Sequence, residues 1–159
     1  MNNKARLILT LSISGLFFIV DRWIKNMSVG PWTGRILLNS YIGWFPSHNA
    51  GIAFGLPIPV WVSISLTIPI LTILAYLFFR SILSPIFNIQ YSISSFALSL
   101  ILFGALSNFY DRIVYRGTLD YFLILTSIIN LADVMIVGGF ILLMLNYKKS
   151  NIQAPNKDV

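Results

Sequence analysis

Four long apolar segments constrain this chain more than any other feature of its 159 residues. They cover residues 7–20, 60–79, 91–110 and 128–147, and the first continues into a charged end at residues 21–25. A helix needs about 20 residues to cross a hydrocarbon core of about 30 Å. Because unpaired backbone groups are costly in lipid, these segments predict four membrane-spanning helices.

The composition excludes several other classes of protein. With 57% hydrophobic and 10% charged residues, the chain is not an ordinary soluble domain. It has no cysteine, which excludes disulfides, thiolate metal sites, lipidated cysteines and a thiol nucleophile. The net charge of +6 comes from basic residues scattered around the apolar segments, so we expect no nucleic acid partner. We expect one membrane domain over residues 1–150, followed by a polar tail at residues 151–159.

The flanks of the first apolar segment bear on topology. Lys4 and Arg6 precede it, as they would in a cleavable signal peptide, but charged residues follow where a small-residue cleavage site should be. We therefore expect a retained helix with its N-terminus in the cytoplasm, and four spans return the C-terminus to the same side.

Residues 27–59 interrupt the helical pattern with five glycines and four prolines, and we expect them to form an outer loop. Within the loop, residues 35–45 are rich in β-compatible and aromatic side chains, which predicts short strands. Trp32, Trp44 and Phe45 suit the level of the lipid headgroups. The predicted fold is an all-α membrane protein of four transmembrane helices with a small β-platform on the outer face.

The acidic residues are few and unusually placed. Asp111, Asp120 and Asp133 are three of only five acidic residues, there is no glutamate, and all three lie at or just inside the ends of apolar segments. An ionised side chain is expensive there, so such residues are candidates for function. The only histidine, His48, has no clustered ligands and is expected to be a hydrogen-bonded loop residue rather than a metal ligand.

Helical spacing groups the polar residues into three sets. Asn108 precedes Asp111 and Arg112 by three and four positions, Asn130 precedes Asp133 by three, and Asp21 precedes Lys25 by four. Each set falls at the outer end of its span, which predicts one polar pocket near the outer boundary. Two close carboxylates in such a pocket would share one proton and serve as an acid and a base in hydrolysis.

Simpler interpretations exist for each of these residues. Asp133 could only stabilise a helix N-terminus, and Asp120 could be a solvated loop charge beside Arg116. Asp111 could itself belong to the carboxylate pair, although we favour a structural ion pair or hydrogen bond. Arg112 is expected to tie the pocket together through bidentate bonds, with contact to headgroups as the alternative.

Five motifs, in order along the chain, resemble the lipoprotein signal peptidases, also called signal peptidase II. They are DRWIK at residues 21–25, NAGIAFG at 49–55, GALSNFYDR at 104–112, LDYF at 119–122 and NLADVMI at 130–136. The family's members are membrane aspartic peptidases of the bacterial inner membrane. The resemblance implies a four-helix fold with a small β-platform on the outer face.

The resemblance also implies a reaction and a site. The family removes the signal peptide of diacylglyceryl-modified prolipoproteins just before the lipidated cysteine, without a cofactor, and is inhibited by globomycin. Its catalytic aspartates match Asp120 and Asp133. The residues that match positions shaping or supporting the site are Asp21, Lys25, Asn49, Gly51, Asn108, Arg112, Asn130 and Ala132. The implied partners are the lipidated precursor and membrane lipids, and the site is expected near the outer face.

The chain departs from the family pattern in three places. Ser107 replaces a usual glycine, Thr118 replaces a usual valine, and the interval between Asp120 and Asp133 is short. These departures bear on the outer connection and substrate fit more than on the two aspartates. A proton-coupled carrier and a structural assembly factor are the alternatives from other classes. A carrier would spread carboxylates across the membrane's depth, whereas here they gather at one end.

Overall fold

The structure is a computed structural model that describes residues 3–51, 56–83 and 89–153. Four helices dominate it: α1 (Asn3–Val29), α2 (Val60–Leu83), α3 (Ile89–Tyr115) and α4 (Leu131–Gln153). Each contains a stretch long and apolar enough to cross a membrane, which confirms the four predicted spans. Large apolar side chains such as Ile8, Leu16, Leu66 and Phe140 lie exposed on the helices, as expected for surfaces that face lipid.

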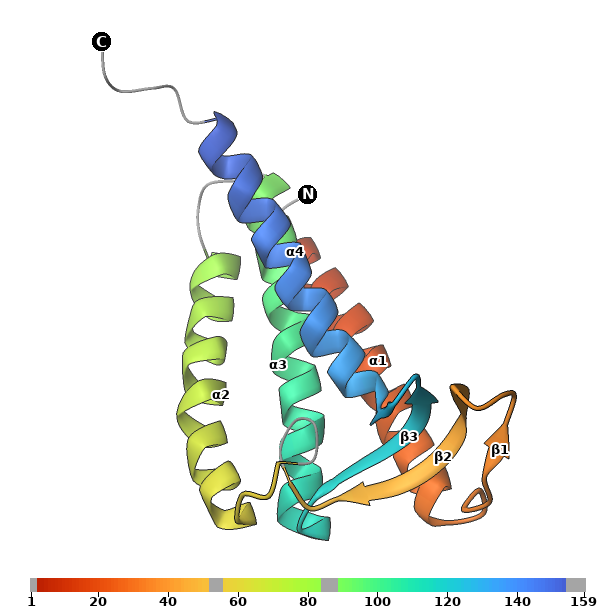
Figure 1. Ribbon diagram of the computed structural model, residues 1–159. Helices are drawn as coiled ribbons and strands as arrows, with labels where there is room; N and C mark the ends of the chain where they lie inside the picture. Colours follow the sequence, from red (N-terminus) through yellow and green to blue (C-terminus); the bar gives the residue numbers. More distant parts are fainter. Residues whose placement is uncertain (1–2, 52–55, 84–88, 154–159) are drawn as a thin grey trace.

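A four-stranded antiparallel sheet projects from one end of the helices (Figure 1). Its strands run in the order β1 (Ile36–Leu37), β2 (Ile42–Asn49), β3 (Thr118–Ile124) and β4 (Ser127–Ile129). The strands predicted within residues 35–45 are therefore present. Half of the sheet, however, comes from the connection between the last two helices. This half was not predicted.

The last helix begins later than its apolar pattern indicates. Residues 128–129, predicted to open the last span, belong to β4 instead. Leu125 has a positive φ of 57°, which turns the chain back between β3 and β4, and Asn130 then caps the helix. At its other end, α4 continues to Gln153, three residues into the predicted polar tail, and residues 154–159 lie outside the described residues.

Helix α3 lies at the centre of the bundle and contacts α1, α2 and α4. Two glycines bring α3 and α4 into close contact. A Cβ atom on Gly104 would lie 2.6 Å from the carbonyl oxygen of Ala132, and one on Gly139 would lie 2.6 Å from that of Ala97. Small residues at such crossings are typical of membrane helices, because association in lipid depends on close packing.

At the end of the bundle opposite the sheet, a buried arginine holds α1 to α2. One Nη atom of Arg6 donates to the carbonyl oxygens of Ser81 and Ile82, at 3.1 and 2.6 Å. These carbonyls belong to the last turn of α2, which has no intrahelical partners for them. Further along the bundle, the hydroxyls of Ser14 and Ser99 bond across α1 and α3 at 2.6 Å.

Candidate active site

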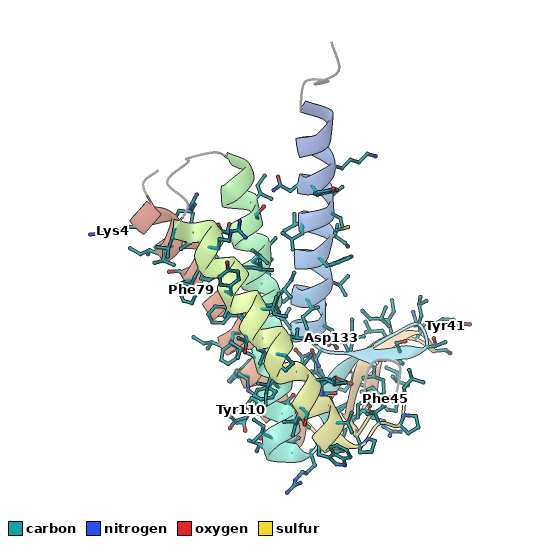
Figure 2. The ribbon with its side chains drawn as sticks, turned by 90° about the vertical axis from the view of Figure 1, so that its left-hand side faces the viewer. Lys4, Tyr41, Phe45, Phe79, Tyr110 and Asp133 are labelled. Atoms are coloured by element: carbon teal, nitrogen blue, oxygen red, sulfur yellow. The ribbon has the colours of Figure 1, made fainter. Side chains whose placement is uncertain are left out.

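The two aspartates expected to be catalytic come from different elements. Asp120 lies on β3, and Asp133 lies in the first turn of α4. Figure 2 shows Asp133 where the base of α4 meets the sheet. One residue binds both carboxylates: the side-chain amide of Asn130 donates to Oδ1 of Asp120 at 2.6 Å, and its backbone N–H donates to Oδ2 of Asp133 at 3.1 Å. The fold thus brings the two predicted residues to a common partner.

Asn130 and Asp133 form a reciprocal cap at the start of α4. The N–H of Asp133 donates to Oδ1 of Asn130 at 2.9 Å, while the Asp133 carboxylate accepts the N–H of Asn130. This is the arrangement of a capping box, with asparagine and aspartate in the two positions. The predicted spacing of three residues allows Asn130 and Asp133 to form this cap, and the cap fixes the Asp133 side chain relative to the helix end.

Asn108 connects this pair to α1. Its amide donates to Oδ1 of Asp133 at 2.8 Å, and its carbonyl oxygen accepts from Nζ of Lys25 at 2.8 Å and from Asn130 at 3.2 Å. Both oxygens of the Asp133 carboxylate are consequently held by amide donors. Asn108 is almost completely buried, and the Asp133 carboxylate on one side and the Lys25 ammonium on the other determine which way its amide points.

Behind Asn108 lies a layer of buried ion pairs. Nζ of Lys25 is 3.1 Å from Asp21 and 2.8 Å from Asp111, and all three side chains are inaccessible. Asp111 is also paired with Arg22 and accepts the N–H of Leu119 at 3.2 Å. The predicted pair of Asp21 and Lys25 and the predicted ion-pair role of Asp111 are confirmed. Arg22 was not predicted as part of the site.

The prediction for Arg112 is wrong in one respect. This half-buried guanidinium interacts electrostatically with Asp133, Asp111 and Asp120. No ion pair joins it to a carboxylate in the part of the chain that the structure describes, so the expected bidentate bonds are absent there. Its Nε atom is buried and has no hydrogen-bond partner among the described residues. The ion pairs of the site come instead from α1, where Arg22 and Lys25 bind Asp111 and Lys25 also binds Asp21.

The end of β2 reaches the site from the outer loop. The Asn49 side chain hydrogen-bonds to Asp120, and its Oδ1 accepts the N–H of Gly51 at 3.0 Å. In the register of the sheet, Asn49 is opposite Thr118, two residues before Asp120. Residues 52–55 of the NAGIAFG motif lie outside the described residues.

The family match rests on most of the chain. The family model described as signal peptidase (SPase) II matches residues 13–148. The chain belongs to the signal peptidase II family. Curated relatives named lipoprotein signal peptidase include one from Bartonella quintana, 34% identical over 146 residues (85% of this chain, 79% of the relative). Another, from Clostridium tetani, is 32% identical over 143 residues (82% and 86%).

Solved structures agree with the fold. Two bacterial membrane enzymes superpose with TM-scores of 0.80 and 0.72, at 24% and 23% sequence identity, each covering 95% of this chain and 94% of the other. This member of the signal peptidase II family is thus a multi-pass bacterial membrane protein with four helices and a small antiparallel sheet.

The electrostatics of this signal peptidase II site favour a retained proton. Burial raises the pKa of Asp120 to about 6, and the nearby charge of Asp133 adds to the increase. Hydrogen bonds from Asn130 and Asn49 and the charge of Lys25 act in the opposite direction. Asp120 is therefore expected to keep its proton at a pH where an isolated aspartate would be ionised.

Three residues of this signal peptidase II site were not identified as site residues from the sequence. Arg22 pairs with Asp111 across two helices, and the hydroxyl of Ser107, at the position that departs from the family glycine, donates to Asp21. The third, Tyr121, lies within the LDYF motif and is completely buried. The sequence marked all three positions, Ser107 by its departure and the other two by the DRWIK and LDYF motifs, but the contacts themselves depend on packing between distant segments.

His48 and Ala132 complete the predicted positions. The exposed ring of His48 lies with Nε2 2.9 Å from the carbonyl oxygen of Tyr115, so the expected hydrogen bond is present, but His48 lies on β2 rather than in a loop. Across the described ranges, no group of three metal-ligating side chains includes it or any other residue. The N–H of Ala132 donates to Oδ1 of Asp21 at 3.2 Å, so this position supports the site through its backbone.

Proposed function

We propose that this chain is an aspartic endopeptidase that removes the signal peptide from diacylglyceryl-modified prolipoproteins, cutting before the lipidated cysteine. Asp120 and Asp133 are the proposed catalytic pair. The observation that carries this proposal is the binding of both carboxylates by Asn130. A shared amide partner keeps two aspartates from distant segments close enough to act as one acid–base unit. The names of the curated relatives supply the substrate class.

The charges around the pair support a single shared proton. The site gathers four carboxylates and three cations from α1, β3, α3 and α4. The carboxylates are Asp21, Asp111, Asp120 and Asp133, and the cations are Arg22, Lys25 and Arg112. With all groups ionised, the buried cluster has one excess negative charge. One proton on the catalytic pair removes that excess, which is costly at membrane depth.

The proposed reaction uses the two carboxylates and water. The ionised member of the pair takes a proton from water, the resulting hydroxide attacks the scissile carbonyl, and the protonated member hydrogen-bonds to the carbonyl oxygen. The C–N bond of the tetrahedral intermediate then breaks, the proton taken from water goes to the amine of the lipidated cysteine, and the signal peptide leaves with a new carboxyl group. Asn108 and Asn130 orient the carboxylates, Arg112 supplies a nearby positive charge, and Asn49 and Gly51 present amide and backbone contacts to the substrate.

The placement of the elements supports a site on the outer side of the membrane. The beginning of α1 and the end of α4 lie at the end of the bundle opposite the sheet (Figure 1). With both termini in the cytoplasm, as the basic flanks predict, the sheet and the catalytic pair lie near the outer face. Diacylglyceryl chains of the substrate would then reach the site from the outer leaflet. The carrier alternative is not favoured, because the relatives are peptidases by name and the buried carboxylates gather at one end.

A cleavage assay tests the proposal. Purified protein in detergent is mixed with a synthetic diacylglyceryl-modified precursor peptide, and the released signal peptide is measured with and without globomycin. We expect cleavage before the lipidated cysteine, inhibition by globomycin, and a loss of kcat of at least about a thousandfold in Asp120→Asn and in Asp133→Asn.

The matched control is Asp158→Asn, the same change near the end of the sequence, which should keep the wild-type rate. Thermal unfolding of each variant confirms that it is folded. Full cleavage by either catalytic-pair variant would remove that residue from the proposed mechanism. No cleavage of the lipidated peptide by the wild-type protein would reject the function itself.

A further inference from the structure

The hydroxyl of Tyr121 joins three elements of the structure at a single buried point. Tyr121 lies on β3 beside Asp120, and its side chain is completely buried. Its hydroxyl donates to Oδ1 of Asp21 on α1 at 2.9 Å and accepts the N–H of Leu131, the first residue of α4, at 2.8 Å. Burial raises the pKa of Tyr121, so its hydroxyl stays protonated and available as a donor.

The first three N–H groups of α4 all depend on this part of the site. That of Leu131 bonds to the Tyr121 hydroxyl, that of Ala132 to Asp21 at 3.2 Å, and that of Asp133 to Asn130. The first N–H groups of a helix have no intrahelical partners, so they determine how the helix end is held. Two of the three are held from outside α4, by β3 and α1.

The ring of Tyr121 is itself held by the sheet. Trp44 of β2 stacks on it, with centroids 5.4 Å apart, and Phe122 packs against it edge-on at 4.8 Å. The indole N–H of Trp44 donates to the carbonyl oxygen of Trp32 at 2.8 Å, which fixes the stacking partner in turn. The hydroxyl is therefore fixed by the packing of the platform, and its removal would leave the ring in place.

From these contacts we propose that Tyr121 is a positioning residue that sets the separation of Asp120 and Asp133. Its backbone follows directly after Asp120 in β3, and its hydroxyl holds the helix end that carries Asp133. One side chain thus connects the strand of one carboxylate to the helix of the other. The inference rests on the proposed function, because a fixed separation is needed only if the two aspartates act together. Positional errors of about 1 Å in such a pair cost on the order of a hundredfold in rate.

The proposal predicts that loss of the Tyr121 hydroxyl changes the pH dependence of kcat. The groups that act on Asp120 are Asp133 of α4, Asn130, Asn49 of β2 and Lys25 of α1, with Arg112 of α3 also within electrostatic range. If α4 moves away from β3, the repulsion between the two carboxylates weakens. The pair then loses its shared proton at a lower pH, and the alkaline side of the kcat profile moves to lower pH.

The test compares Tyr121→Phe with Tyr147→Phe in the full-length protein. Tyr147 is exposed near the far end of α4, so the control removes a hydroxyl without touching the site. The assay is cleavage of the diacylglyceryl-modified precursor peptide across a range of pH values. In Tyr121→Phe we expect kcat to fall on the order of ten- to a hundredfold, KM to stay within about twofold, and the alkaline limb to move to lower pH. Tyr147→Phe should match the wild type.

The outcomes separate this inference from the proposed function. Absence of cleavage by the wild-type protein would reject the function. Cleavage by the wild type together with an unchanged kcat and pH profile in Tyr121→Phe would overturn the positioning role alone. A lower melting temperature in Tyr121→Phe with wild-type kcat and pH profile would also overturn it, because the hydroxyl would then serve stability only.

Discussion

The two ends of the bundle bury charge in opposite ways. At the sheet end, Lys25 lies between two carboxylates, and Arg22 pairs with Asp111. At the far end, Arg6 is equally inaccessible but meets only backbone carbonyls of α2, and its Nε and Nη1 atoms have no partner within the described part of the chain. The cation at the far end therefore binds the free carbonyl groups at the end of α2, whereas Arg22 and Lys25 at the sheet end neutralise carboxylates.

This difference separates the charged residues that stabilise the fold from those that we propose take part in the reaction. At the far end, Arg6 holds α1 against the end of α2 through bonds to two backbone carbonyls. The sheet end contains an excess of carboxylates, which lowers the stability of the fold and is therefore expected where a reaction needs them. Changes at the sheet end should alter cleavage and pH dependence, while changes at the far end should alter stability only.

The largest effect is expected for Lys25→Met. The change leaves Asp21 without its cation, leaves Asp111 with Arg22 alone, and removes the donor to Asn108. Removal of one member of a buried ion pair typically lowers the free energy of unfolding by about 3–5 kcal/mol. Thermal unfolding in detergent measures the loss, with Lys4→Met, at an exposed lysine of the far end, as the matched control. Equal stability of the two variants would show that the buried pairs contribute little.

A smaller effect of opposite sign is expected for Asp120→Asn. The pKa of Asp120 is about 6 in the folded state, above the ordinary value of 3.8. Its contribution to stability is therefore fully present below pH 3.8 and is lost as the pH rises through 6. The asparagine variant does not suffer that loss, so above pH 6 it should be more stable than the wild type by on the order of 2–3 kcal/mol.

This gain should disappear as the pH falls from about 6 towards 4. Thermal unfolding of Asp120→Asn and wild type across that range checks it, with Asp158→Asn as the control that should show no such trend. If Asp120→Asn is less stable than the wild type at pH 8, the surroundings of the ionised Asp120 carboxylate stabilise it as strongly as the ion pairs stabilise Asp111. The proposed catalytic pair would then not lower the stability of the fold.

The smallest effect is expected at the far end, for Arg6→Ala. The change removes the two bonds to the last turn of α2 and should lower the free energy of unfolding by about 1–2 kcal/mol. Cleavage of the lipidated precursor should continue at the wild-type kcat, because the site lies at the other end of the bundle. Lys4→Ala serves as the control. A loss of kcat without a loss of stability would contradict the separation of the two ends.

Spacing along the sequence predicted the contacts between residues that are three or four positions apart. The i, i+4 relation of Asp21 and Lys25 and the i, i+3 relation of Asn130 and Asp133 are both used as expected. The four spans followed from length and hydrophobicity, because lipid leaves few alternatives for a long apolar segment. The family resemblance, rather than composition, indicated which aspartates should be paired.

Contacts between distant segments could not be predicted in this way. Arg22 and Asp111 are 89 positions apart and meet only because α1 and α3 pack at a particular rotation. The expectation that Arg112 would hold the pocket followed from its position beside Asp111, but neighbouring residues on a helix point in different directions. Strands β3 and β4 were missed because short apolar runs fit a strand or the start of a helix equally well.

The glycine contacts between α3 and α4 have a consequence for how the protein responds to its bilayer. At Gly104 and Gly139 the backbones of these two helices approach closely, so there is little room at these two crossings for one helix to slide past the other. A change in hydrophobic thickness would then be met by tilting the two helices as one unit rather than by sliding one past the other. Asn108 and Asp133, one on each helix, would keep their spacing in membranes of different lipid composition.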